Sequence, residues 1–159
     1  MIFLTVGSMF PFDRLIRAVD EMVADGRITD RLTAQIGDGR YEPRHFAFDR
    51  FLDKPEYEVR IAEASLLIAH AGAGTIALAI QRGKPLLVVP RLKSHGEHVN
   101  DHQIATARKF EELGHVLVAR ETAEIPVKLA ALKTFRPMPR EVQTERLARR
   151  IGLLLAGVR

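Results

Sequence analysis

A histidine and two alternate glycines follow a short apolar run near the middle of the chain. Residues 66–69 have the composition of a buried strand, and His70, Gly72, Gly74 and Thr75 come directly after it. Glycines let a backbone approach a ligand closely, and the free amides at the start of a helix bind anions. The spacing is typical of a diphosphate site, although turns of this kind also occur in α/β proteins that bind no nucleotide.

Strand and helix patterns alternate on both sides of this turn. We expect strands at 2–6, 32–36, 66–69, 86–90 and 116–118, a short extended piece at 45–48, and helices at 13–24, 55–64, 74–82 and 99–113. This alternation predicts an α/β fold, a single Rossmann-like domain whose parallel sheet is flanked by helices on both faces. Ligands bind beyond the carboxyl ends of such strands, so the loops after Val6, Ala69 and Pro90 should share one edge.

Composition and charge narrow the functional classes. With 159 residues, 47% of them hydrophobic, the chain is long enough for one domain with a real core. It has no cysteine, which excludes disulfides and thiolate metal sites. The first residues are expected to form a strand rather than a signal peptide, and no apolar stretch approaches the roughly 20 residues of a membrane span. A net charge of +4 favours an anionic partner, but the few aromatics are not interleaved with basic residues as in nucleic-acid-binding proteins.

Further motifs continue from the glycine turn. They are H-A-G-A-G-T at 70–75, G-K-P at 83–85, E-H-V-N-D-H-Q at 97–103 and F-E-E-L-G-H at 110–115. The series resembles the donor-binding half of two-domain (GT-B) glycosyltransferases, and within that class the C-terminal domain of glycosyltransferase family 28. It is similar in particular to short stand-alone exopolysaccharide transferases of the PssE type. It is also similar to the catalytic subunit of the eukaryotic two-subunit UDP-GlcNAc transferase.

The resemblance implies roles for particular residues. The donor diphosphate would lie on Gly7, Ser8, His70, Gly72, Ala73, Gly74 and Thr75, with His70 stabilising the departing UDP. The donor sugar would lie on Asn100, Asp101, His102 and Gln103, and the base on Phe51 and Leu52. Taken from the residues alone, each group has an ordinary alternative: a strand-capping histidine, a plain strand-to-helix turn, a solvated loop whose Asn100 or Asp101 caps the next helix, and core packing.

Two further features of the sequence concern the ribose contact and metal binding. Members of the family commonly have an acid about four positions beyond the motif threonine or close by, and this acid binds the ribose. In this chain Leu78 stands where that acid is often found. Gln81 would be a substitute. His95, His98 and His102 fall within eight positions, but no metallopeptidase motif surrounds them, so we expect no metal site. The resemblance implies no cofactor either, since the UDP-sugar is a substrate.

The activity implied by the resemblance is inverting transfer of a sugar from a UDP-sugar to a lipid-linked glycan, in exopolysaccharide biosynthesis. Residues 1–159 would form a single nucleotide-sugar-binding domain, and a separate membrane-attached subunit would supply the acceptor half. The chain would then be cytoplasmic and peripheral at the inner face of the membrane through this partner. The residues identify neither the general base nor the donor sugar. A non-catalytic nucleotide-binding or regulatory subunit that kept the fold is the alternative.

The C-terminal segment carries an amphipathic pattern. Apolar residues at 142, 147, 151, 154, 155 and 158 have helical spacing, and arginines surround them. We expect a helix at about 140–157 that packs on the sheet; completion of the partner interface or contact with anionic lipid is the alternative.

Overall fold

The computed structural model describes residues 1–139, so the helix expected at 140–157 lies outside the described residues. The strands are β1 (Ile2–Thr5), β2 (Leu32–Gln35), β3 (Ala47–Asp49), β4 (Leu66–His70), β5 (Leu86–Val89) and β6 (Leu117–Val118). The helices are α1 (Asp13–Ala24), α2 (Lys54–Glu63), α3 (Ala73–Gln81), α4 (His102–Glu112) and α5 (Ile125–Leu132), with 3-10 turns at Lys93–His95 and Thr122–Glu124.

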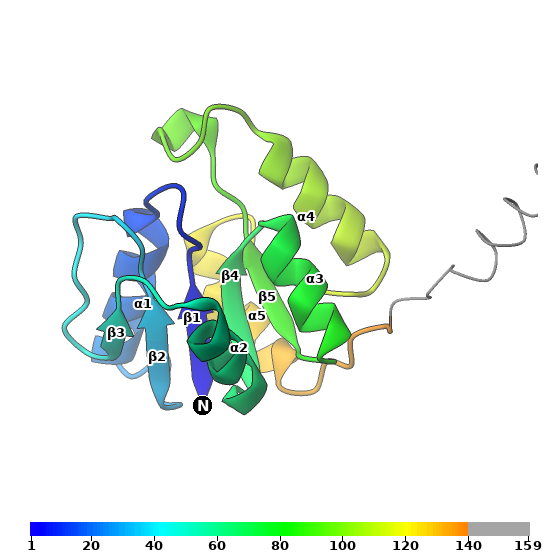
Figure 1. Ribbon diagram of the computed structural model, residues 1–159, viewed down its shortest axis with the longest axis horizontal. Coiled ribbons are helices and arrows are strands. Elements are labelled where there is room, and N and C mark those ends of the chain that lie inside the picture. The colour runs from blue at the N-terminus through cyan, green and yellow to red at the C-terminus, as the bar shows by residue number, and fades with distance from the viewer. Residues whose placement is uncertain (140–159) are drawn as a thin grey trace, which may run out of the picture.

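The sheet is parallel throughout, which confirms the predicted fold class. Its six strands lie in the order β3-β2-β1-β4-β5-β6. The strand order therefore reverses between β1 and β4, where Thr5 is in register with Ala69. Figure 1 shows the loops that follow β1, β4 and β5 leaving the sheet at the same upper edge. The crevice beyond this reversal point is where open α/β sheets bind ligands.

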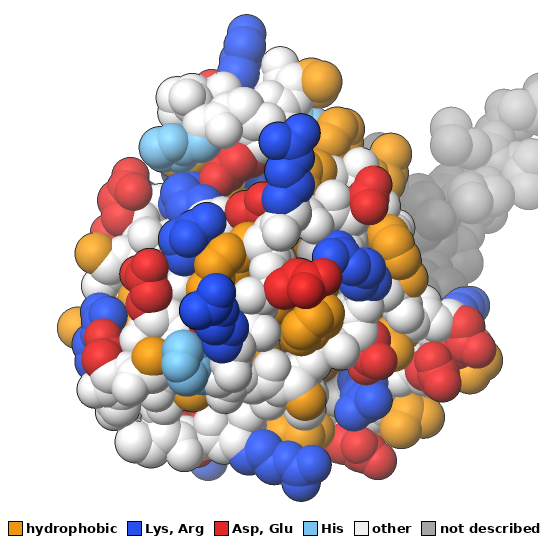
Figure 2. Space-filling view, turned by 90° about the vertical axis from the view of Figure 1, so that its left-hand side faces the viewer, with side chains coloured by type: hydrophobic (Ala, Val, Ile, Leu, Met, Phe, Trp, Pro, Cys, Tyr) orange, Lys and Arg blue, Asp and Glu red, His pale blue; other side chains and the backbone are white. Residues whose placement is uncertain are grey.

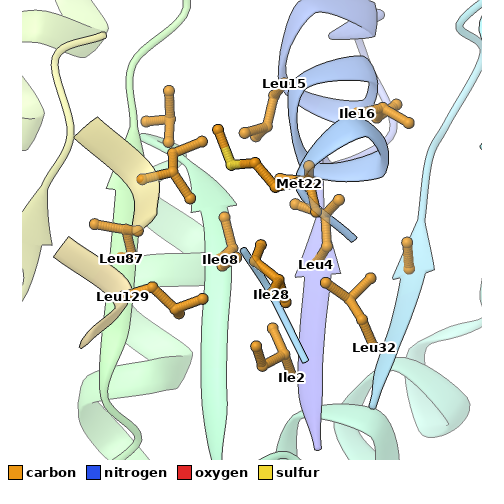
Figure 3. Packing of buried hydrophobic residues seen from close by; sticks show 14 of the residues in the cluster. Ile2, Leu4, Leu15, Ile16, Met22, Ile28, Leu32, Ile68, Leu87 and Leu129 are labelled. Atoms are coloured by element: carbon orange, nitrogen blue, oxygen red, sulfur yellow. The ribbon is translucent and has the colours of Figure 1, made fainter. Parts of the chain in front are cut away.

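Each face of the sheet has its own hydrophobic cluster. On one face, α1 and α5 pack against alternate residues of the central strands; Figure 3 shows Leu15 and Met22 of α1 and Leu129 of α5 facing Leu4 and Ile68. On the other face, α2, α3 and α4 cover the remaining residues of the same strands, with Ile61, Ile76 and Ala107 in the second cluster. Strands buried on both faces explain the near-continuous apolar runs of the sequence.

The structure moves the start of one expected helix and adds a helix that was not expected. The helix expected from residue 99 begins at His102, because the preceding loop makes side-chain hydrogen bonds back to the backbone near Leu92 and Lys93 instead of continuing the helix. The short helix α5 was not expected, although its Ile125, Leu129 and Leu132 are buried at helical spacing. Within residues 1–139, no helix has the length and apolar character that crossing a membrane requires.

One buried carboxylate holds the long loop between β2 and β3. Asp20 on α1 is 2% exposed and accepts hydrogen bonds from the Tyr41 hydroxyl, the Arg44 and His45 amides and His45 Nδ1. Burial alone raises the pKa of Asp20, but the hydrogen bonds from Tyr41 and the two amides outweigh it and lower the pKa below 3.8. The loop therefore depends on an ionised residue at this position.

Asp20→Asn is expected to lower the free energy of unfolding by about 2 kcal/mol at pH 7, because an NH2 group that cannot accept replaces one of the two oxygens that accept hydrogen bonds from the loop. Tyr41→Phe removes only one bond and should cost about 1 kcal/mol. Because the folded pKa of Asp20 is depressed, the deficit of the Asn variant should shrink as the pH falls through and below 3.8. Urea denaturation measures both. Equal stability of the Asn variant and the wild type at pH 7 would refute this role.

Candidate active site at the strand-order reversal

The imidazole of His70 lies between two glycine turns at the ends of β1 and β4. A Cβ added to Gly7 would lie 2.8 Å from His70 Cε1, and one added to Gly72 would lie 2.2 Å from His70 Nε2. Gly7 also has a φ of 73°, in the left-handed region that favours glycine. Both glycines are therefore required by close contact with the ring. The structure brings together residues that are 65 positions apart in the expected diphosphate site.

The environment of His70 keeps its ring neutral. Burial, assisted by the positive charge of Arg91, lowers the pKa of His70 to about 4. Its Nδ1 is buried and has no hydrogen-bond partner of normal geometry among the described residues, although a backbone contact with Thr5 raises the pKa of the ring against the larger effect of burial. Nε2, on the opposite side of the ring, faces the Gly72 turn. At neutral pH this imidazole can donate a hydrogen bond to an anion at the turn as an uncharged group.

This depressed pKa predicts a pH dependence of stability. Above pH 6.5 His70 is neutral in both folded and unfolded chains, so it adds no pH dependence. As the pH falls from 6.5 to about 4, the unfolded chain takes up a proton that the folded chain excludes, and the free energy of unfolding should fall by up to about 3 kcal/mol. His70→Gln should lack this contribution. Denaturation at pH 7 and pH 4.5 tests it, and equal losses for the two proteins would contradict it.

The first turn of α3 presents backbone amides without a side-chain cap. Gly72 is the N-cap residue, and the first helical hydrogen bond runs from Ile76 to its carbonyl, so the amides of residues 73–75 have no partner within the helix. Ala73 and Gly74 are exposed, and a Cβ added to Gly74 would meet nothing within 4 Å. Free amides at the positive end of a helix dipole are an arrangement that favours anions, and here two of the three belong to exposed residues beside His70.

Thr75 and Ser8 occupy different positions around this site. The Thr75 hydroxyl is buried and lies 3.0 Å from the hydroxyl of Tyr57 on α2, so part of its bonding capacity serves packing between α2 and α3. Ser8 is exposed in the turn that follows β1. The sequence did not single out Tyr57, whose ring also packs edge-on against Phe3.

The residues expected on the donor sugar have unequal exposure. Gln103 is 3% exposed and its Oε1 accepts from the Arg91 amide, while Asp101 accepts from the Lys93 amide. Asp101 is the N-cap residue of α4 but makes no capping bond; Asn100 Oδ1 accepts from the His102 amide instead. These bonds shape the loop, and they leave Asn100, Asp101 and His102 exposed at the edge of the sheet.

Aromatic rings connect this loop to the turn after β1. The His98 ring lies 4.7 Å from Phe10 and 4.5 Å from His102. Burial, with the charges of His102 and Arg91, lowers the pKa of His98. His102 Nδ1 also bonds Asn100 Oδ1, which can only accept, so the proton is on Nδ1. Over residues 1–139, no group of three or more His, Cys, Asp or Glu side chains is arranged to hold a metal ion.

The remaining residues predicted to contact the nucleotide lie after β3 and on α3. Phe51 is 52% exposed after β3, whereas Leu52 packs against the cluster beneath α2 and α3. Leu78, which stands where an acid is often found, also packs against that cluster, and Gln81 is exposed at the end of α3. The apolar character of Leu78 thus serves the core.

Sequence reasoning missed the residues that join the three loops. Arg91, two residues after the end of β5, is 2% exposed and donates to backbone carbonyls in the loop after β1. Arg14 on α1 makes a two-bond ion pair with Glu97. The available signal was an arginine directly after an apolar strand, a position that places its charge at the ligand-binding edge.

Sequence comparison identifies the family. The profile of the Glycosyltransferase family 28 C-terminal domain matches residues 1–148, and the chain belongs to this family. A UDP-N-acetylglucosamine transferase subunit, ALG13 of Homo sapiens, is 36% identical over 124 residues, which cover 72% of this chain and 10% of the human protein. The UDP-N-acetylglucosamine--N-acetylmuramyl-(pentapeptide) pyrophosphoryl-undecaprenol N-acetylglucosamine transferase of Paramagnetospirillum magneticum is 37% identical over 81 residues, or 51% of this chain and 20% of that protein. The chain thus spans a small part of these relatives.

Solved structures share the fold at low sequence identity. The solution structure of ALG13 has a TM-score of 0.58 and 22% identity, covering 94% of this chain and 93% of that one. The glycosyltransferase of kitacinnamycin has a TM-score of 0.63 and 17% identity, covering 96% of this chain but 37% of its own. The present chain therefore has the fold of one half of a GT-B glycosyltransferase.

Proposed function

We propose that this chain is the donor-binding and catalytic subunit of an inverting glycosyltransferase that uses a UDP-sugar. The observation that carries the proposal is the neutral His70 ring held between Gly7 and Gly72 beside the uncapped amides of α3. Amides at a helix start bind a diphosphate, and a neutral donor beside them stabilises the negative charge that develops as UDP departs. No step of this chemistry calls for a bound metal.

The relatives support a particular donor and acceptor. The printed names of the sequence relatives describe UDP-N-acetylglucosamine transferases, and this favours UDP-GlcNAc as the donor. The human relative is named as a subunit, and the bacterial relative's substrate is a pyrophosphoryl-undecaprenol compound. We propose a lipid-linked glycan acceptor, which the name of the bacterial relative supports. We also propose a role in exopolysaccharide biosynthesis, which rests on the motif resemblance to PssE-type transferases. A membrane-attached partner would supply the acceptor half and hold the chain at the inner face of the membrane.

Within the site, each group has a separate task. The amides of residues 73–75, with the Gly7–Ser8 turn, would hold the diphosphate, and His70 would donate to its leaving oxygen. Asn100, Asp101 and His102 would contact the sugar, with the buried Gln103 shaping their loop. Phe51 and Leu52 would lie along the base. Transfer requires closure by an acceptor half that excludes water from the donor.

Calorimetric titration tests this function. We expect the wild-type chain to bind UDP and UDP-GlcNAc, with UDP-glucose and UDP-glucuronic acid as comparison donors. His70→Ala should weaken UDP binding about tenfold or more, because a neutral donor at the phosphates is lost. His95→Ala is the matched control, since His95 is exposed on the 3-10 turn. Absence of UDP binding at millimolar concentration, with and without partner, would refute the proposal.

A non-catalytic nucleotide-binding or regulatory subunit is the second candidate, favoured by Leu78 at the position where an acid commonly grips the ribose. It predicts UDP binding without turnover when the partner and acceptor are present. Nucleic-acid binding has less support, because Lys and Arg are interspersed with Asp and Glu on the face shown in Figure 2.

A further inference from the structure

Arg91 is a buried cation at the centre of the motif loops. It is 2% exposed, and its guanidinium donates to the carbonyls of Val6 (2.6 Å), Phe10 (2.5 Å) and Pro11 (3.3 Å). Its own amide is fixed by Gln103 on α4. One side chain therefore fixes the whole turn after β1 to the start of the loop after β5.

The charge of Arg91 is not neutralised by an ion pair of its own. Glu97 is the acid whose charge reaches it, but both Glu97 carboxylate oxygens bond Arg14. Burial lowers the pKa of Arg91 to about 10, which still leaves it fully charged at neutral pH. The Phe12 ring lies beneath the guanidinium carbons of both arginines, at 5.0 Å for Arg91. Burying such a charge costs several kcal/mol, so a neutral residue would suit a purely structural role better.

The charge is directed at the ligand edge. Arg91 holds the carbonyl of Val6, the residue before Gly7, and Gly7 contacts the His70 ring. Among the described residues, the side chains whose charges affect the pKa of His70 are Arg91 and His98. Both lower it, and neither is an acid. Without a ligand, the loop edge beyond β1 and β4 therefore carries the positive charge of Arg91, which a diphosphate would offset.

We propose that Arg91 is a positioning residue for the donor diphosphate: it holds the Gly7–Ser8 turn against His70 and supplies a fixed positive charge behind the phosphate site. This inference rests on the proposed function, since it assigns the source of the charge that attracts UDP at that site. It makes Arg91 distinct from groups that touch the donor directly, because its donors are directed at backbone carbonyls.

The test compares Arg91→Met, which removes the charge, with Arg91→Lys, which keeps it but cannot bridge the same carbonyls. Arg82→Met is the matched control, because Arg82 lies at the far end of α3, paired with Glu58. UDP affinity is measured by calorimetry at two salt concentrations. The pKa of His70 is measured by NMR titration of its ring protons in the ligand-free chains.

Arg91→Met should weaken UDP binding about tenfold or more, reduce the salt dependence of binding and raise the pKa of His70 from about 4 toward 6.5. Arg91→Lys should keep the low pKa of His70 while shifting the amide signals of Gly7 and Ser8. If Arg91→Met does not fold, the inference still requires Arg91→Lys to show both effects. If the wild type binds UDP and the folded Arg91 variants bind it with the same affinity, this inference alone is overturned. Failure of the wild type to bind UDP would overturn the proposed function with it.

Discussion

His70→Ala is expected to lower the rate of sugar transfer by about 10²–10³-fold, the usual cost of removing one preorganised donor from a developing oxyanion. The reason is that the neutral ring, fixed between Gly7 and Gly72, is a side-chain donor held beside the start of α3. The rate is measured as UDP released from UDP-GlcNAc in membranes that contain the partner and acceptor. Part of this loss should appear as weaker UDP binding, because the hydrogen bond from His70 also contributes to binding before the reaction.

His70→Gln is the informative companion variant. Its amide nitrogen can donate as the imidazole does, so it should recover part of the rate. Because the pKa of His70 is about 4, this ring should contribute no pH dependence to the wild-type affinity for UDP-GlcNAc between pH 6 and 8. UDP-GlcNAc is used here because its esterified diphosphate lacks the terminal phosphate ionisation near pH 6. Equal rates for His70→Ala and the wild type would remove His70 from the mechanism.

Gly72→Ala is expected to abolish measurable UDP binding, although it adds a single methyl group. The new Cβ would lie 2.2 Å from His70 Nε2, so the ring must leave its position or the turn must open. Either change separates the imidazole from the amides of α3. The measurement is calorimetric titration with UDP, accompanied by urea denaturation to establish that the variant folds.

Gly74→Ala tests whether a methyl group in the space expected for the diphosphate weakens binding when the His70 ring is not displaced. Its Cβ would meet no protein atom within 4 Å, so the variant should fold with unchanged or slightly higher stability. Helical Cβ atoms tilt toward the helix start, which places this methyl group near the free amides. We expect UDP affinity to fall about tenfold while the His70 signals stay unchanged. Normal UDP binding by both glycine variants would place the ligand elsewhere.

The sheet and the turn at its centre could be predicted because local patterns determine them. The apolar runs at 66–69 and 86–90 and the glycines beyond them specify buried parallel strands and a tight turn without help from distant residues. The family match confirms the resemblance on which the site residues were assigned. The roles of those residues stay predictions.

The contacts that join distant loops could not be predicted. Arg91 meets Val6, 85 positions earlier, and a single sequence gives no sign that this arginine turns inward. Gln103 has the expected position, but its side-chain oxygen accepts a hydrogen bond from the Arg91 amide, a contact that depends on how the loop from Leu92 to Asp101 folds back on itself. The helix α5 was missed because its eight residues make only about two turns, too short a stretch for the helical spacing of its apolar residues to be distinctive.

Amide NMR of the wild-type chain during titration with UDP tests the central claim most directly. We predict saturable shifts of the amide signals of Gly7, Ala73, Gly74 and Thr75 and of the His70 ring-proton signals, because the diphosphate would lie between β1 and the start of α3. Shifts confined to another surface, such as the groove lined by Pro55, Val59 and Glu63 on α2, or no shifts at millimolar UDP, would contradict it.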